Sequence, residues 1–199
     1  MRRAIRQYGD PVLRAKGERI RRVDQRIREL AADMLETMHA AHGVGLAAQQ
    51  VGEALQLTVI DVAEVEDRPS TLKINGEAAD VTGAMPIVLL NPEVTLGAEI
   101  TIGLEGCLSF PEISAEIDRS ESVVVRAQTL ENEPILIEAT GLLARALQHE
   151  VDHLNGILFI DRMSSALKVS LAGKLKRLQK ETQGGERRGR SFSADQSAL

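Results

Sequence analysis

Hydrophobic positions in the first part of the chain follow helical spacing. They recur every three or four residues on a segment that ends at Gly43, namely Val23, Ile27, Leu30, Met34, Met38 and Ala41. Asp24 is a favourable N-cap, and a glycine is a natural end for a helix. The pattern therefore predicts one amphipathic helix between Asp24 and Gly43.

From about residue 56 to residue 140 the pattern is that of strands. β-branched residues and turn punctuation predict strands at 56–62, 86–90, 94–102, 121–128 and 135–140, and Asn75-Gly76 predicts a hairpin turn within the polar stretch 63–85. Because no helical pattern separates the later strands, they are expected to pair antiparallel. The predicted fold class is α+β, with antiparallel sheets around a central helix.

That central helix is predicted directly after the last strand. At about 100° per residue, its side chains form three stripes. One is apolar (Leu143, Leu147, Val151, Leu154), one carries histidines (Leu142, Ala146, His149, His153), and one is polar (Arg145, Gln148, Asp152, Asn155). Gly156 ends the helix. The polar stripe, Arg145 included, is expected to point away from the histidine stripe.

The histidine stripe contains His149-Glu150-Val151-Asp152-His153, a His-Glu-x-x-His motif. Two imidazoles four residues apart can bind one metal ion on a helix, and Glu150 at the border of the stripe can reach a water on that metal. The alternative is two histidines on a solvated surface. We favour the metal site, because the motif fits a metal-plus-base mechanism at every position and lies in the helix that this mechanism needs.

A catalytic site of this kind needs a third protein ligand from another segment, since the fourth position is kept for water. A histidine six residues after His153 would indicate a metzincin, but Phe159 stands there. The remaining candidates are His39 and His42, placed in the first helix, and the single cysteine, Cys107. One cysteine with two histidines is a known catalytic ligand set, for which zinc is the common metal.

Residues 43–50, Gly-Val-Gly-Leu-Ala-Ala-Gln-Gln, match the weak dinucleotide fingerprint Gly-x-Gly-x-x-Ala. That fingerprint follows a strand and opens a helix, whereas this stretch follows a helix and precedes a strand. We interpret it as an extended segment whose backbone lies close to a ligand, with a glutamine amide directed at the same place. An ordinary loop after a helix is the alternative.

Composition supports one aliphatic domain. The 199 residues are 43% hydrophobic but only 2% aromatic, which leaves Leu, Val, Ile and Ala to build the core. A single cysteine excludes an intramolecular disulfide and fits a reducing compartment. No apolar run approaches transmembrane length. We therefore predict a cytoplasmic protein that contacts neither membrane nor DNA directly.

Charged residues are unevenly distributed, with a basic C-terminal segment following an acidic body. Residues 164–199 carry a net charge of +5 within a chain of net charge −5. Ser164 is a suitable N-cap for a helix with leucines on one face and lysines on the others. The predicted organisation is a catalytic domain over residues 1–163, a basic amphipathic helix over 164–183 and a disordered tail over 184–199.

Three segments together resemble the peptide deformylase family. Residues 43–50 match Gly-Φ-Gly-Φ-Ala-Ala-x-Gln, residues 105–109 match Glu-Gly-Cys-Φ-Ser, and residues 149–156 match His-Glu-x-x-Asp-His-Leu-x-Gly. A weaker resemblance runs from Gly9 to about Met163. It implies a metal-dependent hydrolase that removes the formyl group from the N-terminal formyl-methionine of newly synthesised polypeptides and releases formate.

The resemblance also implies a role for each matching residue. Cys107, His149 and His153 would hold the metal, which is Fe²⁺ in native members, with zinc, nickel and cobalt as possible substitutes. Glu150 would act as the base. The Gln50 amide and the backbone N–H of Leu108 would donate to the oxyanion, an interaction worth about 3 kcal/mol.

Further residues of the resemblance surround the ligands. Glu105 would pair with Arg119 beside the cysteine, where the alternative is a surface ion pair worth about 0–1 kcal/mol. The substrate's methionine and backbone would lie against Val44, Gly45, Leu142 and Ala146. The chain differs from compact bacterial members in the long stretch 63–85, from some members in Arg145, where they have an aliphatic residue near the substrate side chain, and from some relatives in Gly103, where they have a larger residue.

Two other functions compete with this reading. A metallopeptidase would use the same His-Glu-x-x-His machinery, but Cys107 and the Gln50 segment favour the formyl-amide hydrolase. A non-catalytic deformylase-like protein could bind ribosomes or nascent chains through the basic helix. Such a protein would not need Glu150 or the three ligands, all of which are present. Formylated nascent peptides, and the ribosome through the C-terminal helix, are the expected partners.

Overall fold

The computed structural model describes residues 1–194, with side chains through Gly184. Its main layer is a seven-stranded antiparallel sheet. In spatial order the strands are β1 (Gly45–Ala47), β2 (Leu57–Ile60), β5 (Ile87–Leu96), β8 (Ser122–Gln128), β9 (Pro134–Thr140), β3 (Leu72–Ile74) and β4 (Glu77–Ala78). A separate antiparallel pair comprises β6 (Ile100–Gly106) and β7 (Ser114–Ser120). The predicted α+β class with antiparallel sheets is confirmed.

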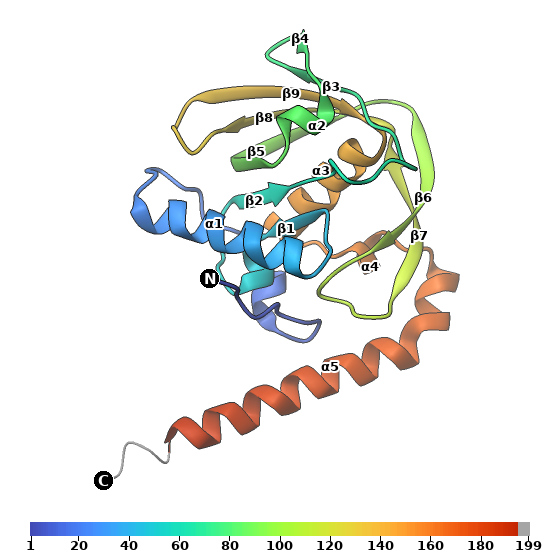
Figure 1. Ribbon diagram of the computed structural model, residues 1–199. Helices are drawn as coiled ribbons and strands as arrows, with labels where there is room; N and C mark the ends of the chain where they lie inside the picture. The colour runs from blue at the N-terminus through green and yellow to red at the C-terminus, as the bar shows by residue number, and fades with distance from the viewer. Residues whose placement is uncertain (195–199) are drawn as a thin grey trace.

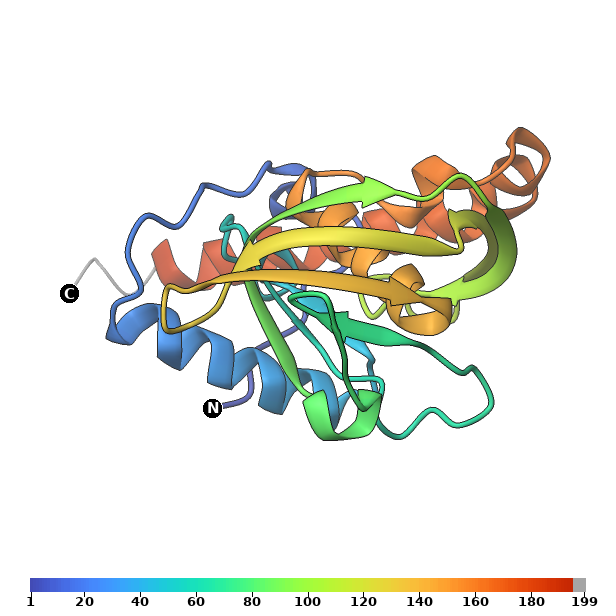
Figure 2. The ribbon, with the colours of Figure 1, turned by 90° about the horizontal axis from the view of Figure 1, so that it is seen from above.

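Helix α3 (Gly141–Leu154) lies between the main sheet and the β6–β7 pair (Figures 1 and 2). Its apolar side chains pack into a core with Ile60, Leu89, Val125 and Ile137 of the sheet. The side chain of Thr140, at the N-cap, makes no capping hydrogen bond. Instead, the Oγ of Ser70 accepts a hydrogen bond from the backbone N–H of Leu143 at 2.9 Å, so the stretch 63–85 satisfies one of the unpaired donors at the start of this helix.

The first predicted helix is α1 (Gln25–Ala40), and Asp24 caps it by accepting a hydrogen bond from the backbone N–H of Ile27. The helix packs against β1 and β2 over a second apolar cluster. Short helical segments complete this part of the fold: η1 (Pro11–Arg14), η2 (Ala48–Val51), α2 (Val81–Ala84) and α4 (Phe159–Arg162).

The strands differ from the prediction in two places. The predicted strands 86–90 and 94–102 are divided differently: β5 continues through both as far as Leu96, with a register irregularity between Leu90 and Glu93 that accommodates Pro92, and the end of the second prediction belongs to β6. Strand β7 was not predicted at all. Its inward positions include Arg119 as well as Ala115 and Ile117, and a buried arginine conceals the alternation of apolar and polar residues that marks a strand.

The polar stretch 63–85 contains the predicted hairpin, in which Asn75 and Gly76 have positive φ angles of 52° and 87° between β3 and β4. This hairpin extends the main sheet beyond β9. Residues 63–85 are the stretch that compact relatives were expected to lack. In this chain they form the edge of the sheet, and their Ser70 caps α3.

The C-terminal helix α5 (Ser165–Ala194) begins after Ser164, whose Oγ accepts a hydrogen bond from the backbone N–H of Leu167 at 3.3 Å. Its leucines pack beneath the body in a third apolar cluster that includes Phe110 and Phe159 (Figure 1). The helix continues over residues 184–194, which were expected to be disordered; the rest of the predicted tail, 195–199, lies outside the described residues. Among the described helices, none is long and apolar enough to cross a membrane.

Candidate active site

Three candidate metal ligands converge beside α3. Cys107 follows directly from β6, whereas His149 and His153 lie one turn apart on α3. Their ligand atoms all lie within 4.8 Å of one another, and Cys107 Sγ is 3.3 Å from His153 Nε2. The other candidate histidines are not part of this cluster: His39 pairs with Asp61, and His42, which lies just beyond the end of α1 and not within it, lines the neighbouring cavity. Cys107 is therefore the third residue of the cluster.

The protonation of the two imidazoles suits a metal site. Burial lowers the pKa of His153 well below its usual value, so the ring is neutral, the form that binds a metal. For His149 burial opposes the charged form, but hydrogen bonds with Cys107 and Glu105 outweigh it and raise the pKa. A proton and a metal ion therefore compete for this ring, as is general for metal-binding imidazoles. The donor set of one thiol and two imidazoles fits a divalent transition metal.

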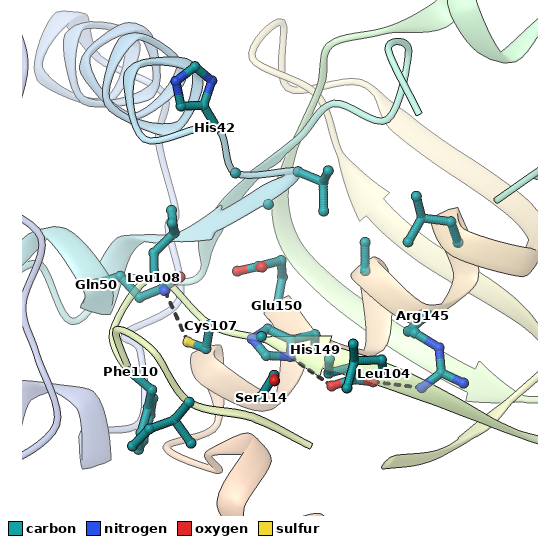
Figure 3. Close-up of a pocket in the computed structure, with 18 of the residues that line it drawn as sticks. His42, Gln50, Leu104, Cys107, Leu108, Phe110, Ser114, Arg145, His149 and Glu150 are labelled. Carbon is teal, nitrogen blue, oxygen red and sulfur yellow. Dashed lines mark hydrogen bonds and ion pairs between the residues drawn. The ribbon is translucent and has the colours of Figure 1, made fainter. Parts of the chain in front are cut away.

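Glu150 points into the space beside the cluster (Figure 3). The residue is 4% exposed, and burial raises the pKa of its carboxyl group to about 7. Within the described part of the chain, its Oε2 has no hydrogen-bond partner. A Cβ at position 45 would overlap the carboxylate, so Gly45 is the residue that gives Glu150 its room. A buried carboxyl group with a pKa near neutrality is suited to take and return a proton.

Two hydrogen-bond donors flank the same space. Gln50 Oε1 accepts a hydrogen bond from the backbone N–H of Ala47 at 2.8 Å, which directs Nε2 toward Cys107 Sγ at 3.6 Å and Ser109 Oγ at 3.3 Å (Figure 3). The backbone N–H of Leu108 makes no hydrogen bond to any residue that the structure describes. The Leu108 N–H is therefore free to bind an oxygen that gains negative charge near Cys107, and Gln50 Nε2 can reach the same oxygen if it exchanges its contact with Cys107 Sγ or Ser109 Oγ.

These groups face one cavity of about 650 Å³, within the range of about 300–1,000 Å³ that small-ligand sites occupy. The residues predicted to contact substrate line its apolar side: Val44, Gly45, Leu142 and Ala146. Lining residues that the sequence did not indicate include Arg68, Leu104 and Ile113, and the cavity is also lined by His42, which was considered only as a ligand, and by Arg145. The cavity can therefore hold an unbranched apolar side chain next to the metal cluster.

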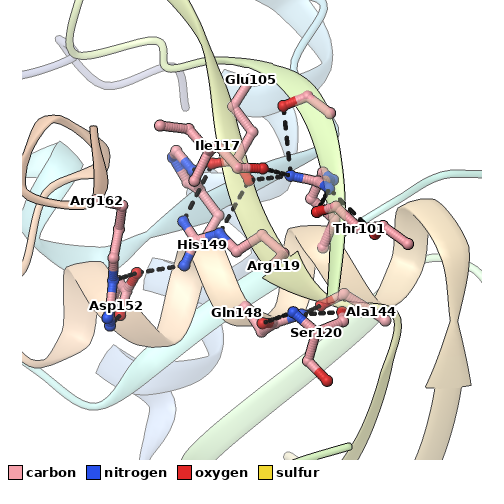
Figure 4. Close-up of polar contacts among 12 residues, drawn as sticks. Thr101, Glu105, Ile117, Arg119, Ser120, Ala144, Gln148, His149, Asp152 and Arg162 are labelled. Atoms are coloured by element: carbon pink, nitrogen blue, oxygen red, sulfur yellow. Dashed lines mark hydrogen bonds and ion pairs between the residues drawn. The ribbon is translucent and has the colours of Figure 1, made fainter. Parts of the chain in front are cut away.

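Glu105 and Arg119 form the predicted pair, with Arg119 Nε donating to Glu105 Oε1 at 2.9 Å and Nη2 donating to Oε2 at 3.1 Å (Figure 4). Their side chains are only 5% and 4% exposed, so the alternative of a surface ion pair is wrong. Burial raises the pKa of Glu105, but hydrogen bonds from His149 and Arg119 outweigh it and lower the pKa to about 2. An ionised Glu105 holds His149 Nδ1 at 3.0 Å and so orients its ring.

The sequence missed the polar residues of α3 as members of this site. Gln148 and Asp152 are buried under the β6–β7 pair, where Arg119 donates to Asp152 and Gln148 bonds the backbone of Ser120. Arg145, expected to point away, is 7% exposed and donates to Glu105 Oε1 at 2.9 Å. Because β7 was not predicted, this side of the helix seemed open to solvent.

Comparisons with known proteins identify relatives over most of the chain. The sequence model of the family described as "Polypeptide deformylase" matches residues 2–169. The peptide deformylase of Opitutus terrae is 44% identical over 180 residues, which cover 89% of this chain and 93% of the relative, and that of Methylacidiphilum infernorum is 45% identical over 173 residues, covering 87% and 90%.

Solved structures agree with the sequence relatives. Peptide deformylase 1B of Arabidopsis thaliana, in complex with an inhibitor, is 36% identical with a TM-score of 0.79 and covers 93% of each chain. The peptide deformylase of Thermus thermophilus is 37% identical with a TM-score of 0.77, covering 91% of this chain and 99% of the relative.

Proposed function

The chain belongs to the polypeptide deformylase family, and we propose that Cys107, His149 and His153 hold the metal ion on which its activity depends. The enzyme removes the formyl group from the N-terminal formyl-methionine of newly synthesised polypeptides. The observation that supports this assignment of residues best is the convergence of the three ligand atoms beside a buried glutamate at one cavity.

When bound, the metal supplies a Lewis acid that activates water and polarises the formyl carbonyl group. Glu150 takes a proton from the attacking water and returns it to the leaving amine, which its raised pKa permits. Gln50 Nε2 and the Leu108 N–H donate to the formyl oxygen as it gains negative charge. Glu105, held by Arg119, keeps the His149 ring in its binding orientation.

Fe²⁺ is the metal that we assign to the site, with zinc, nickel and cobalt as substitutes. One thiol with two imidazoles accepts all of these ions, so the assignment depends on measurement. Formate release from a formyl-Met-Ala-Ser peptide, assayed anaerobically after loading with each metal, tests it. Formate without cleavage of the Met-Ala bond supports a deformylase, cleavage of that bond supports a metallopeptidase, and higher activity with zinc than with iron contradicts the choice of metal.

The apolar wall of the cavity predicts selection for an unbranched first side chain. Val44, Leu142 and Ala146 offer only aliphatic surface, and one methylene in such a pocket is worth about 1–3 kcal/mol. We expect formyl-norleucine peptides to react with a modest loss in kcat/KM and formyl-Glu peptides to fail. The measurement is kcat/KM for formyl-Met, formyl-norleucine and formyl-Glu peptides of equal length. Equal kcat/KM values for the formyl-Met and formyl-Glu peptides would contradict selection by an apolar pocket.

The exposed face of α5 supports a second part of the proposal, salt-sensitive binding to the ribosome. Lys168, Lys174, Lys176 and Lys180 are exposed there, while the leucine face packs on the body. Cations opposite RNA phosphates give affinity that falls steeply with salt. Deletion of 164–199 would also strip Leu178 from the core, so charge reversal is the cleaner change.

We expect the quadruple change of these four lysines to glutamate to reduce co-sedimentation with ribosomes at low salt and to leave formate release from a short peptide unchanged. The control matched in charge reverses four exposed cations of the body, Arg21, Arg22, Lys73 and Arg126, to glutamate. Ribosome binding that persists in the quadruple variant, or that falls equally in the control, would show that α5 is not the binding element.

A further inference from the structure

Arg145 joins three elements around the metal cluster. Its Nη1 donates to Glu105 Oε1 and to the carbonyl oxygen of Ile117, both at 2.9 Å, and its Nη2 donates to the carbonyl oxygen of Thr101 at 3.0 Å. Figure 4 shows Thr101, Glu105 and Ile117, which supply these acceptors, gathered beside α3. One buried guanidinium thereby connects α3 to β6 and β7.

Gly103 is the partner that makes room for this guanidinium. Its φ is not in the left-handed region, so backbone conformation does not require a glycine here. A Cβ at this position would lie 2.9 Å from both Cζ and Nη2 of Arg145. A solvent-exposed arginine would move aside, but this one is buried and held by several acceptors. Any larger residue at position 103 therefore displaces the guanidinium.

The link matters because the ligands come from two separately held elements. Cys107 follows β6, which pairs only with β7 among the described strands, whereas His149 and His153 belong to α3. Glu105 precedes Cys107 by two residues and accepts hydrogen bonds from Arg119, Arg145 and His149. Arg119 is tied to β6 through the strand ladder, and Arg145 is the one of these donors whose side chain also donates to the backbone of β6.

We propose that Arg145, accommodated by Gly103, is a positioning residue that sets the distance between Cys107 and the two histidines and thereby the affinity for the metal. The inference rests on the metal cluster of the proposed function, but it concerns ion binding and not the reaction. It accounts for the joint presence of Arg145 and Gly103 in this chain, since the guanidinium occupies the volume that a Cβ at position 103 would need.

Cobalt binding measures the effect without any peptide substrate. The dissociation constant is determined by competition with a chelator, and the thiolate-to-cobalt absorption band reports the Cys107 bond. We expect Arg145→Leu to weaken Co²⁺ binding by about 10–100-fold, the usual cost of losing a partner behind a ligand, and to diminish that band. Arg145→Lys keeps the charge without the forked geometry and should recover only part of the affinity.

Gly103→Ala should weaken Co²⁺ binding in the wild-type background, whereas Gly173→Ala on α5, outside the cavity, is the control, because a Cβ there meets nothing within 4 Å. In the Arg145→Leu background, Gly103→Ala should cost little, since no guanidinium remains to displace. Equal costs in both backgrounds, or wild-type cobalt affinity in Arg145→Leu, would overturn the proposal.

Thermal unfolding without metal identifies a variant that is merely misfolded. If Arg145→Leu does not fold, the comparison of Gly103→Ala with Gly173→Ala and the cobalt affinity of Arg145→Lys still decide the question. A wild-type protein that binds cobalt but releases no formate would contradict the proposed function and leave this inference standing.

Discussion

Glu150→Ala should lower kcat for formate release by at least about 100-fold, the lower end of what a general acid–base residue contributes, while the protein retains about one metal ion per chain. The carboxylate lies beside the ligand cluster but is not one of its three members. Its removal takes away the group that moves the proton and no donor to the metal. Metal analysis and steady-state formate release on the same preparation provide the measurement.

Glu150→Gln is the necessary companion, because alanine also opens a cavity in a buried place. The amide keeps the volume of the side chain but cannot accept a proton, so it should be as inactive as the alanine variant. Glu116→Ala, an exposed carboxylate on β7, serves as the control and should retain full activity. Loss of metal from Glu150→Gln would mean that the glutamate is a ligand instead of the base.

Much of the metal site could be predicted from the sequence because its information is local. His149, Glu150 and His153 lie within five residues on one helix, and helical geometry alone brings the two rings together. Asp24 likewise marks the start of α1 through local capping chemistry, whereas the predicted end at Gly43 was three residues late, because α1 ends at Ala40 and the left-handed residue after it is His42. The place of Cys107, by contrast, depended on the family resemblance, since no local pattern relates it to α3.

What the sequence could not supply is the cover over the polar side of α3. Arg145, Gln148 and Asp152 look like a solvated stripe until β7 is recognised, and β7 is hidden by its own buried Arg119. The failure to predict β7 and the mistaken view of the polar side of α3 as solvated have one cause. Buried ion pairs place charged residues on both facing surfaces, so hydrophobic periodicity fails on each side of the contact at once.

The packing around the active site also explains why three of its positions are glycines, which composition alone does not. Gly45 leaves space for Glu150, Gly43 for Leu108 and Gly103 for Arg145. None of these three has a positive φ. Each is small because a functional side chain occupies the volume that a Cβ would need, which a reading based on backbone turns cannot detect.

Cys107→Ala should have the opposite signature to Glu150→Ala, because the metal itself should be lost. Two imidazoles remain, and a site with two protein ligands binds a divalent ion far more weakly than one with three. Free metal at 100 times its dissociation constant stabilises a folded protein by about 2.7 kcal/mol. Cys107→Ala should lack most of this stabilisation. In metal-containing buffer its Tm should therefore lie roughly 5–9 °C below that of the wild type, for a domain of this size.

Thermal unfolding with and without added metal separates this effect from simple loss of packing. The wild-type Tm should rise with metal, whereas the Cys107→Ala Tm should be nearly the same in both buffers. Cys107→Asp, which restores an anionic ligand, should regain part of the metal-dependent increase. Full metal content and full activity in Cys107→Ala would require another third ligand, yet His39 is paired with Asp61, and neither His39 nor His42 belongs to the ligand cluster. Within the described residues no other His, Cys, Asp or Glu joins the two histidines in a cluster of this kind, so the loss of metal from this one variant decides the assignment.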